Sequence, residues 1–329
     1  MYMYYKTMTK KENTMNPLTS LTSTMAELDL RSCLISQRGQ LAFEYYRNQH
    51  TATEIAKINS CTKSILSSLI CIAMDQGQLP KPDTAITEFF PQLITDKDAR
   101  KQEITLHHLL TMSAGFNWTE FGGQNSFPHM TRSAHWVDFV LEQSLAHLPG
   151  TKMEYNSGIS QLLSAILVQA TGMTTARFAE RYLFGPLGIE AYKWEVDPQG
   201  IHTGGFGLWL RPSDMLKFGQ LFLQQGTWDN QQLISRRLVA QSAEPFITVE
   251  APYRGSYGWH WWTDSYTDSS DMLSASTTPY FYARGYGGQY VYVIPSLHIV
   301  VVLSDDKRKK KHVSADVFRE IIAPLLVMQ

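Results

Sequence analysis

One apolar helix, which begins at a Ser-x-x-Lys sequence, constrains this chain more than any other feature. Residues 59–64 read NSCTKS and run directly into ILSSLICIAM. The apolar residues that follow recur at helical spacing: Ile65, Leu66, Leu69, Ile70 and Ala73. The pattern stops near Gly77, with Pro80 beyond it. We therefore expect a buried helix with Ser60 in its first turn.

Ser60 and Lys63 are three residues apart, so on a helix they share one face. The lysine side chain leans back toward the helix N-terminus, where unpaired N–H groups favour negative charge on the serine oxygen and depress the lysine pKa. The alternative is that Ser60 or Asn59 only caps the helix while Lys63 extends to solvent. A second match, Ser304 to Lys307, opens a charged run and is expected to be a solvated loop.

The sequence pattern changes along the chain. Apolar runs on either side of Arg38 and Gly39, within residues 32–48, predict a β-hairpin before the helix. Helical stripes that mostly end at Gly or Pro fill the middle: TAITEFFPQL, ITLHHLLTMSAGF, SAHWVDFVLEQSLAHLPG, GISQLLSAILVQATG and RPSDMLKFGQLFLQQG. β-rich runs return in YGWHWW and GGQYVYVIPSLHIVVVLSD, and a last helix is expected over ADVFREIIAPLL.

This order of elements predicts the fold class α+β, because strands and helices do not alternate strictly. We expect an antiparallel sheet flanked by helices, with an all-helical lobe over about residues 85–200. One domain is expected over residues 28–329. Residues 1–27 are polar and rich in Met and Thr, so a loosely ordered N-terminal extension is expected there.

The amino-acid composition limits the classes of molecule that the protein is expected to bind. The net charge of -1 and the pI of about 6.8 give no electrostatic reason to expect nucleic acid or a membrane, so a small-molecule substrate is favoured. The three cysteines, Cys33, Cys61 and Cys71, fit neither a disulfide framework nor a metal site. No apolar run of signal-peptide length is found, and we expect a cytoplasmic protein without metal or cofactor. The oligomeric state stays open.

Two later segments complete a three-part pattern. KMEYNSG places Tyr155 in a short polar loop before a helix, and YARGYGG places a Gly-rich turn at the head of a late strand. Together with Ser60-Cys61-Thr62-Lys63, these segments resemble the signatures of the serine β-lactamase and penicillin-binding-protein superfamily. The similarity is greatest to its class C-like branch, which includes family VIII esterases, D-amino-acid amidases and 6-aminohexanoate-dimer hydrolases. It spans about Arg31 to Asp305 and implies a β-lactamase/transpeptidase-like fold.

The resemblance implies a role for each residue of the pattern. Ser60 would attack a carbonyl and form an acyl-enzyme, while Lys63 and Tyr155 would share the proton transfers. Lys63 is expected to lower the pKa of the phenol, and which of the two is the general base stays open. Two backbone N–H groups would stabilise the oxyanion. These are the N–H of Ser60 and a donor from the turn at Gly285, with Tyr286 the first choice and Gly288 the second.

Two positions depart from the family pattern. The usual Tyr-x-Asn is here Tyr155, Asn156 and Ser157, so a serine stands where the amide is expected. The resemblance implies that Asn156 and Ser157, like the turn at Gly285, contact the substrate or the oxyanion. The usual Lys or His before the glycine of the third motif is replaced by Ala283, with Arg284 next to it.

Both changes favour an esterase or amidase acting on a small acyl compound, with weak or no β-lactamase activity. The alternatives are a D-Ala-D-Ala-type carboxypeptidase, a non-catalytic ligand-binding or sensor protein, or an α/β-hydrolase with Ser113 of TMSAG as nucleophile.

The remaining candidates have simpler explanations. His107 and His108 lie in an apolar helical run and are expected to be structural. As a strand, YGWHWW would place Trp259 and Trp261 on one side and His260 and Trp262 on the other, with core packing favoured over a cleft wall. Cys61 is expected to be a small buried filler, and Lys307 to Lys311 a solvated loop.

Overall fold

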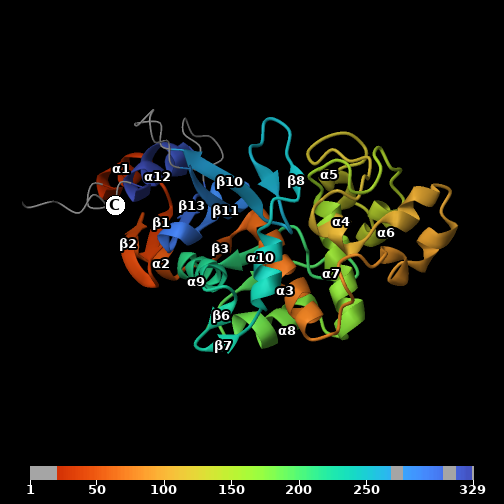
Figure 1. Cartoon of the computed structure of the whole chain (residues 1–329), viewed down its shortest axis with the longest axis horizontal. Coiled ribbons are helices and arrows are strands. Elements are labelled where there is room, and N and C mark those ends of the chain that lie inside the picture. The colour runs from red at the N-terminus through yellow and green to blue at the C-terminus, as the bar shows by residue number, and fades with distance from the viewer. Residues whose placement is uncertain (1–20, 268–276, 307–315, 328–329) are drawn as a thin grey trace, which may run out of the picture.

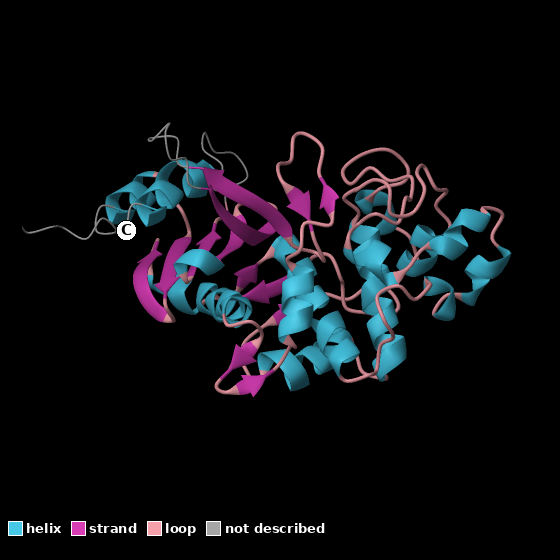
Figure 2. Cartoon of the chain, viewed as in Figure 1, coloured by secondary structure: helices cyan, strands magenta, loops and turns pink. Residues whose placement is uncertain are grey.

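The computed structural model describes residues 21–267, 277–306 and 316–327. An eight-stranded antiparallel sheet lies on one side of the molecule and a group of helices and loops on the other, as Figure 1 and Figure 2 show. The order of strands is β2-β1-β13-β12-β11-β10-β9-β8. The fold class is therefore α+β, with the antiparallel sheet and the helical side that the sequence predicts.

The long strands of the sheet are β1 (Ser32–Gln37), β2 (Gln40–Tyr46), β10 (Trp262–Thr267), β11 (Thr277–Gly285), β12 (Gln289–Ile294) and β13 (Ile299–Ser304). Its short strands are β8 (Ile247–Thr248) and β9 (Ser256–Tyr257). Small separate ladders are formed by β3 (Ala56–Lys57), β4 (Lys193–Trp194), β5 (Leu208–Leu210), β6 (Thr227–Trp228) and β7 (Gln231–Gln232).

The α-helices are α1 (Leu21–Glu27), α2 (Gln49–Thr53), α3 (Thr62–Asp75), α4 (Leu106–Leu110), α5 (Phe127–Met130), α6 (Trp136–Leu141), α7 (Ser157–Thr171), α8 (Thr175–Ala179), α9 (Pro212–Leu223), α10 (Arg236–Ser242) and α12 (Ala323–Val327). Short 3-10 helices are η2 (Asn59–Cys61), η3 (Ile86–Glu88), η4 (Pro91–Thr95), η5 (Ala99–Glu103) and η7 (Pro295–Leu297). Two π-helical turns are η6 (Glu180–Phe184) and η8 (Val317–Ile322).

The sheet is buried on both faces, and alternate residues of its central strands enter two different cores. Val291 of β12 and Val302 of β13, which are register partners, belong to the core that contains α3, α7 and α9. Tyr292 and Val301 are also partners and belong to the core that contains α1 and the C-terminal helix. Burial of both faces explains why these strands are apolar along their whole length.

The N-terminal hairpin and the apolar helix are confirmed. β1 and β2 pair across a turn at Arg38 and Gly39, both of which have positive φ angles (50° and 79°). The helix α3 is buried over almost its whole length and packs against α7. It lies at the centre of the molecule in Figure 1, between the sheet and the helical side.

The segment 21–27 differs from the loose order expected for the N-terminal extension. It forms α1, in which Leu21 and Met25, four residues apart, are both buried. Side chains at this spacing share one helix face, so even a short helix can enter a core. Residues 1–20 lie outside the described residues.

YGWHWW is not the continuous strand expected from its alternation. Residues 258–261 form the turn of a hairpin in which Tyr257 of β9 pairs with Trp262 of β10. His260 has a φ of 57° and donates its backbone N–H to the carbonyl of Leu110 at 2.9 Å, which interrupts the strand. Trp259 and Trp261 nevertheless enter one core and Trp262 the other.

The middle of the chain contains shorter helices than its stripes predict. TAITEFFPQL forms only the two 3-10 turns η3 and η4, and the predicted helix over 104–116 is reduced to α4. Pro91 fits the first turn of η4, where no backbone hydrogen bond is needed. No helix in the described parts of the chain is long and apolar enough to cross a bilayer.

Candidate active site

Ser60 lies in the short 3-10 turn η2, directly before α3, and its side chain is half-exposed. The preceding Asn59 has a φ of 48°, a left-handed conformation that asparagine tolerates better than most residues. The Asn59 side-chain amide donates to the carbonyl of Tyr286 at 2.7 Å. The turn that carries Ser60 is thereby fixed against the end of β11.

Lys63 is buried, with only 1% of its surface exposed, and does not extend to solvent. Its ammonium donates to Ser60 Oγ at 3.3 Å, to Ser157 Oγ at 3.0 Å and to the carbonyl of Gly205 at 2.8 Å. Burial lowers the pKa of Lys63 to about 8, although the charge of Glu120 acts in the opposite direction. A large part of Lys63 is therefore a neutral amine near pH 8, able to accept a proton from Ser60.

Tyr155 completes the group, but its phenol differs from the expectation of a lowered pKa. Its hydroxyl is hydrogen-bonded to Ser60, and burial raises the pKa of Tyr155 far above its usual range. The Lys63 Nζ lies over the face of the ring, 4.7 Å from its centroid. Tyr155 is therefore a neutral phenol at physiological pH, which makes Lys63 the better base of the two.

Asn156 and Ser157 have different surroundings. The Asn156 side-chain oxygen accepts from the N–H groups of Gly158 and Ile159 at 2.7 and 3.2 Å, so Asn156 caps α7. Ser157, at the amide position of the motif, accepts a hydrogen bond from Lys63 Nζ at 3.0 Å. Of the two, only Ser157 belongs to the hydrogen-bonded group around Ser60.

Glu120 and Gly205 also belong to the site, although neither was predicted from the sequence. Glu120 accepts from the Ser157 hydroxyl, from the Ser157 N–H at 2.9 Å and from the Trp118 indole at 2.8 Å. A β-carbon on Gly205 would lie only 3.0 Å from Lys63 Nζ. Both residues come from loops without periodicity, and no local motif indicates them.

The Gly-rich turn lies against the Ser60 turn. A β-carbon on Gly285 would meet the carbonyl oxygen of Ile58 at 2.3 Å, so only glycine permits this approach. Tyr286 follows the last residue of β11, and its backbone N–H is outside the strand ladder. Gly288 has a φ of 98° and completes the turn into β12.

The position of the missing motif cation is filled by a buried methyl group. Ala283 packs in the same core as α3. The neighbouring Arg284 points to the other face of β11, where its guanidinium carbon lies 5.2 Å from the ring centroid of Tyr253 and 5.7 Å from that of Trp262. Arg284 therefore does not replace the motif cation at its own place in the strand.

A hollow of about 390 Å³ opens beside Tyr155. Its ionisable lining consists of Glu120, Glu154, Glu250 and Lys152, in addition to tyrosines. Lys152 is already paired with Glu250 at 3.1 Å, so carboxylates are in excess. Trp262 stacks on Tyr155 with centroids 5.8 Å apart, so this tryptophan packs in the core and also supports the site.

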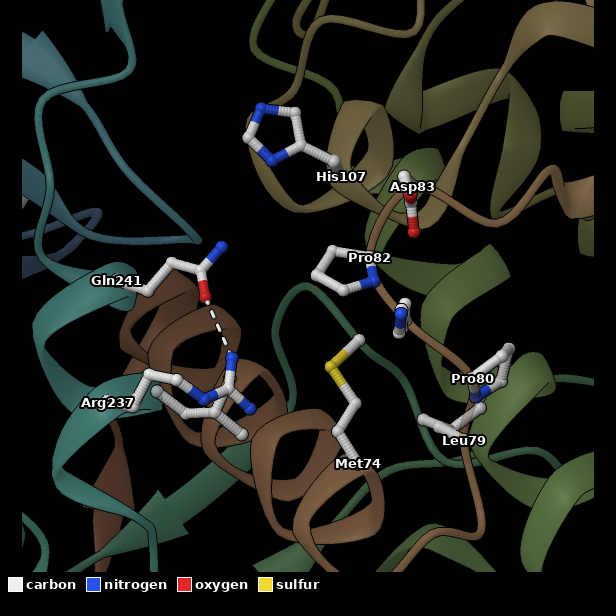
Figure 3. A pocket seen from close by; sticks show the side chains of 10 residues that line it. Met74, Leu79, Pro80, Pro82, Asp83, His107, Arg237 and Gln241 are labelled. Carbon is white, nitrogen blue, oxygen red and sulfur yellow. Dashed lines mark hydrogen bonds between the residues drawn. The ribbon is translucent and has the colours of Figure 1, made fainter.

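A larger cavity of about 510 Å³ lies near the C-terminal end of α3 (Figure 3), and Ser60 is not among the residues that line it. Its lining includes Met74, Pro82, Arg237 and His107. The ring of His107 accepts from the Trp259 indole at 3.1 Å, in agreement with the predicted structural histidine. His108 likewise accepts from the backbone N–H of Thr105 at 3.2 Å.

The other serine candidates are buried. Ser113 is hydrogen-bonded to Thr111 at 2.8 Å, and the strands of the described residues pair antiparallel, unlike the parallel sheet of an α/β-hydrolase. Ser304 is not in a solvated loop: it ends β13 and is hydrogen-bonded to Ser32 at 2.6 Å. Residues Lys307 to Lys311 lie outside the described residues. Cys61 is buried as expected.

Comparisons with known proteins identify the family and the fold of the chain. A family model described as Beta-lactamase matches residues 32–320. A search of curated proteins finds no match.

Solved structures with the same fold are distant in sequence. A putative 6-aminohexanoate-dimer hydrolase from Bacillus anthracis is 18% identical, with a TM-score of 0.77 over 94% of this chain and 81% of that one. A class C beta lactamase from Rhodobacter sphaeroides is 15% identical, with a TM-score of 0.66 over 95% and 99%. EstCE1, a hydrolase with promiscuous acyltransferase activity, is 13% identical, with a TM-score of 0.71 over 94% and 97%. The fold is that of the β-lactamase and penicillin-binding-protein superfamily, as the three motifs predict.

Proposed function

Because the chain belongs to the beta-lactamase family of hydrolytic serine enzymes, we propose that it is a serine hydrolase that forms an acyl-enzyme on Ser60. The observation that carries the proposal is the buried Lys63 amine, 3.3 Å from the half-exposed Ser60 hydroxyl, with a pKa of about 8. A nucleophile and a base in hydrogen-bond contact are the first requirement of covalent acyl transfer.

Acylation uses Lys63 as base and Tyr155 as proton carrier. Neutral Lys63 takes the proton of Ser60 as Oγ bonds to the substrate carbonyl carbon, and the carbonyl electron pair moves onto oxygen. The N–H groups of Ser60 and Tyr286 stabilise this oxyanion. The carbonyl then re-forms, the bond to the leaving group breaks, and the leaving group takes a proton from the Lys63 ammonium through the Tyr155 hydroxyl.

Deacylation repeats these steps with water. Lys63 takes a proton from water as its oxygen bonds to the acyl carbon, and the bond to Ser60 breaks when the tetrahedral intermediate collapses. Ser60 recovers its proton from Lys63, and the products are a carboxylic acid and the free enzyme. One lysine can serve both halves because it is regenerated as a neutral amine each time.

The substrate is a small ester or amide without a carboxylate near the reacting carbonyl. Ala283 offers no charge to a substrate carboxylate, and the hollow beside Tyr155 contains three carboxylates against one lysine. Like charges across a site disfavour binding. β-lactams and D-Ala-D-Ala peptides both present a carboxylate, so we expect weak or no turnover of either. The buried free cysteines support a cytoplasmic enzyme.

The test is labelling with a fluorophosphonate probe, followed by intact-mass measurement and peptide mapping. One adduct per chain, located on Ser60 and lost in Ser60→Ala, is expected, because the probe phosphorus bonds to an activated serine oxygen as fluoride leaves. Ser113→Ala should label like the parent protein. An unlabelled protein would overturn the proposal and favour a ligand-binding or sensor role.

Substrate preference is tested on unlabelled parent protein that has been shown to react with the probe. Three substrates are compared: p-nitrophenyl acetate, a p-nitrophenyl ester of similar length that carries a carboxylate, and nitrocefin. Turnover of the neutral ester should exceed that of the other two. Rapid hydrolysis of nitrocefin would contradict the proposed substrate class but not the acyl-serine mechanism.

A further inference from the structure

Glu120 binds the residue that stands in the place of the motif amide. One carboxylate oxygen, Oε1, accepts from the Ser157 hydroxyl. The other, Oε2, accepts from the Ser157 N–H at 2.9 Å and from the Trp118 indole at 2.8 Å. These three donors fix both oxygens, so the carboxylate has one orientation relative to Ser157.

The direction of the hydrogen bonds follows from the number of protons available. Lys63 Nζ donates to Ser157 Oγ at 3.0 Å, so that oxygen is an acceptor toward the lysine. A hydroxyl has a single proton, and here that proton goes to Glu120. The result is an ordered chain in which Lys63 donates to Ser157 and Ser157 donates to Glu120.

An asparagine in place of Ser157 would need no such partner, because its side-chain oxygen can accept from the lysine while its NH₂ group is separate. Without a second partner, a serine could rotate its hydroxyl proton toward Lys63, and its oxygen would then no longer be oriented to accept from the lysine. A carboxylate on the far side prevents that rotation. The serine at the amide position and the carboxylate beside it therefore belong together.

We propose that Ser157 and Glu120 together replace the amide of the family motif, and that Glu120 is a positioning residue that acts on Lys63 through the Ser157 hydroxyl. This inference rests on the proposed function. When Lys63 gains the serine proton during acylation, the new ammonium donates toward a hydroxyl that is polarised by a carboxylate. Charge-assisted hydrogen bonds of this kind are stronger than neutral ones.

The other groups that act on Lys63 do not supply this charge. Tyr155 and Cys61 are kept neutral by burial, which raises the pKa of both. His260, whose backbone carbonyl accepts from Ser64 Oγ of α3, is neutral because burial lowers its pKa to about 3. Glu120 supplies a carboxylate whose charge raises the pKa of Lys63.

The test measures the rate at which the fluorophosphonate probe labels Ser60 as a function of pH. In Glu120→Gln the midpoint of the rise should fall by about one pH unit, because the ammonium loses a nearby negative charge. The rate at pH 9 should fall by about threefold to tenfold, since a weaker base removes the serine proton less well. Glu120→Asp should keep the charge and give an intermediate midpoint.

A double-mutant cycle separates the pairing from a general loss of structure. Ser157→Asn sets the reference rate for the cycle, and adding Glu120→Gln to it should lower that rate much less than Glu120→Gln does in the parent. Such non-additivity is expected only if the two residues act as one unit. Glu195→Gln is the matched control, since Glu195 is also half-buried and paired with a lysine, Lys57, at 2.8 Å.

The outcomes distinguish this inference from the proposed function. A parent protein that is labelled at Ser60, together with a folded Glu120→Gln variant of unchanged midpoint, would overturn the relay and leave the hydrolase intact. Equal effects of Glu120→Gln with Ser157 and with Asn at position 157 would also overturn it. Failure of the parent to label would remove the proposed function itself.

Discussion

At the scale of single residues, burial decides which protonation states the site can use. Lys63 is buried and Tyr155 is partly buried, and in each the neutral form is favoured: the lysine pKa falls to about 8 and the phenol pKa rises. The Ser60 residue is partly exposed. A substrate thus meets an exposed hydroxyl backed by a buried amine, and the phenol is left to carry protons.

The pH dependence of acylation follows from Lys63. Only the neutral amine accepts the serine proton, so the labelling rate of Ser60 should rise with pH, with a midpoint near the Lys63 pKa of about 8, and level off above it. The measurement is the rate of fluorophosphonate labelling between pH 6 and 10. Lys63→Gln should lose at least about a hundredfold in rate. A rate that falls through the same range would show that the charged lysine is the active form.

The side-chain contacts of the site that could be predicted from the sequence join residues that are near each other in the chain. Ser60 and Lys63 are one helical turn apart, and their contact follows from helix geometry alone. Glu120 reaches Ser157 across 37 positions, from a loop, and Gly205 reaches Lys63 across 142. Such contacts depend on how the loops pack, which no local pattern determines. The sequence predicted a lowered pKa for Tyr155, whereas burial raises it. This prediction was wrong for the same reason, since the burial of a side chain depends on the whole fold.

At the scale of elements, the position of Tyr155 depends on the start of α7. Asn156 caps this helix with two hydrogen bonds from its side-chain oxygen. The sequence placed Asn156 among the residues that bind substrate because it is part of the motif. Its neighbours in the structure indicate that it holds the helix end between Tyr155 and Ser157.

Asn156→Ala tests this role. Loss of the cap should lower the free energy of unfolding by about 1 kcal/mol, because two helix N–H groups lose their acceptor. Asn156→Asp keeps an acceptor and is the control. The measurement is urea denaturation of both variants, with probe labelling as a second readout. A stable Asn156→Ala variant that no longer labels would instead assign Asn156 to the chemistry.

The elements with strong periodicity were predicted, and the irregular ones were not. Helix α3 and the first hairpin follow their apolar patterns. The alternation in YGWHWW predicts which core each tryptophan enters. It does not predict the turn at His260, whose backbone N–H donates to the carbonyl of Leu110. Strand β11 was not predicted as a separate element, although it carries Ala283 and Gly285.

At the scale of the whole molecule, one hydrophobic core lies on each face of the sheet, and the two cores contain different helices. One contains the helix of Ser60 and Lys63, and the other contains α1, η8 and α12. Aromatic side chains of the second core form a stacked series across the sheet, in which Trp262 contacts Tyr282, Tyr282 contacts Tyr292 and Tyr292 contacts Phe318. Trp262 also stacks on Tyr155, so this core supports the site from behind.

Helix α1 should therefore stabilise the fold without taking part in catalysis. Met25 is fully buried in the second core, and Met25→Ala should cost about 3 kcal/mol of unfolding free energy, because it leaves a cavity. Labelling of Ser60 in the folded variant should be unchanged. Leu41→Ala, at an apolar residue of β2 that is 50% exposed, is the control and should change stability by less than about 0.5 kcal/mol. Equal stability of the two variants, measured by urea denaturation, would mean that α1 is not part of the cooperative fold.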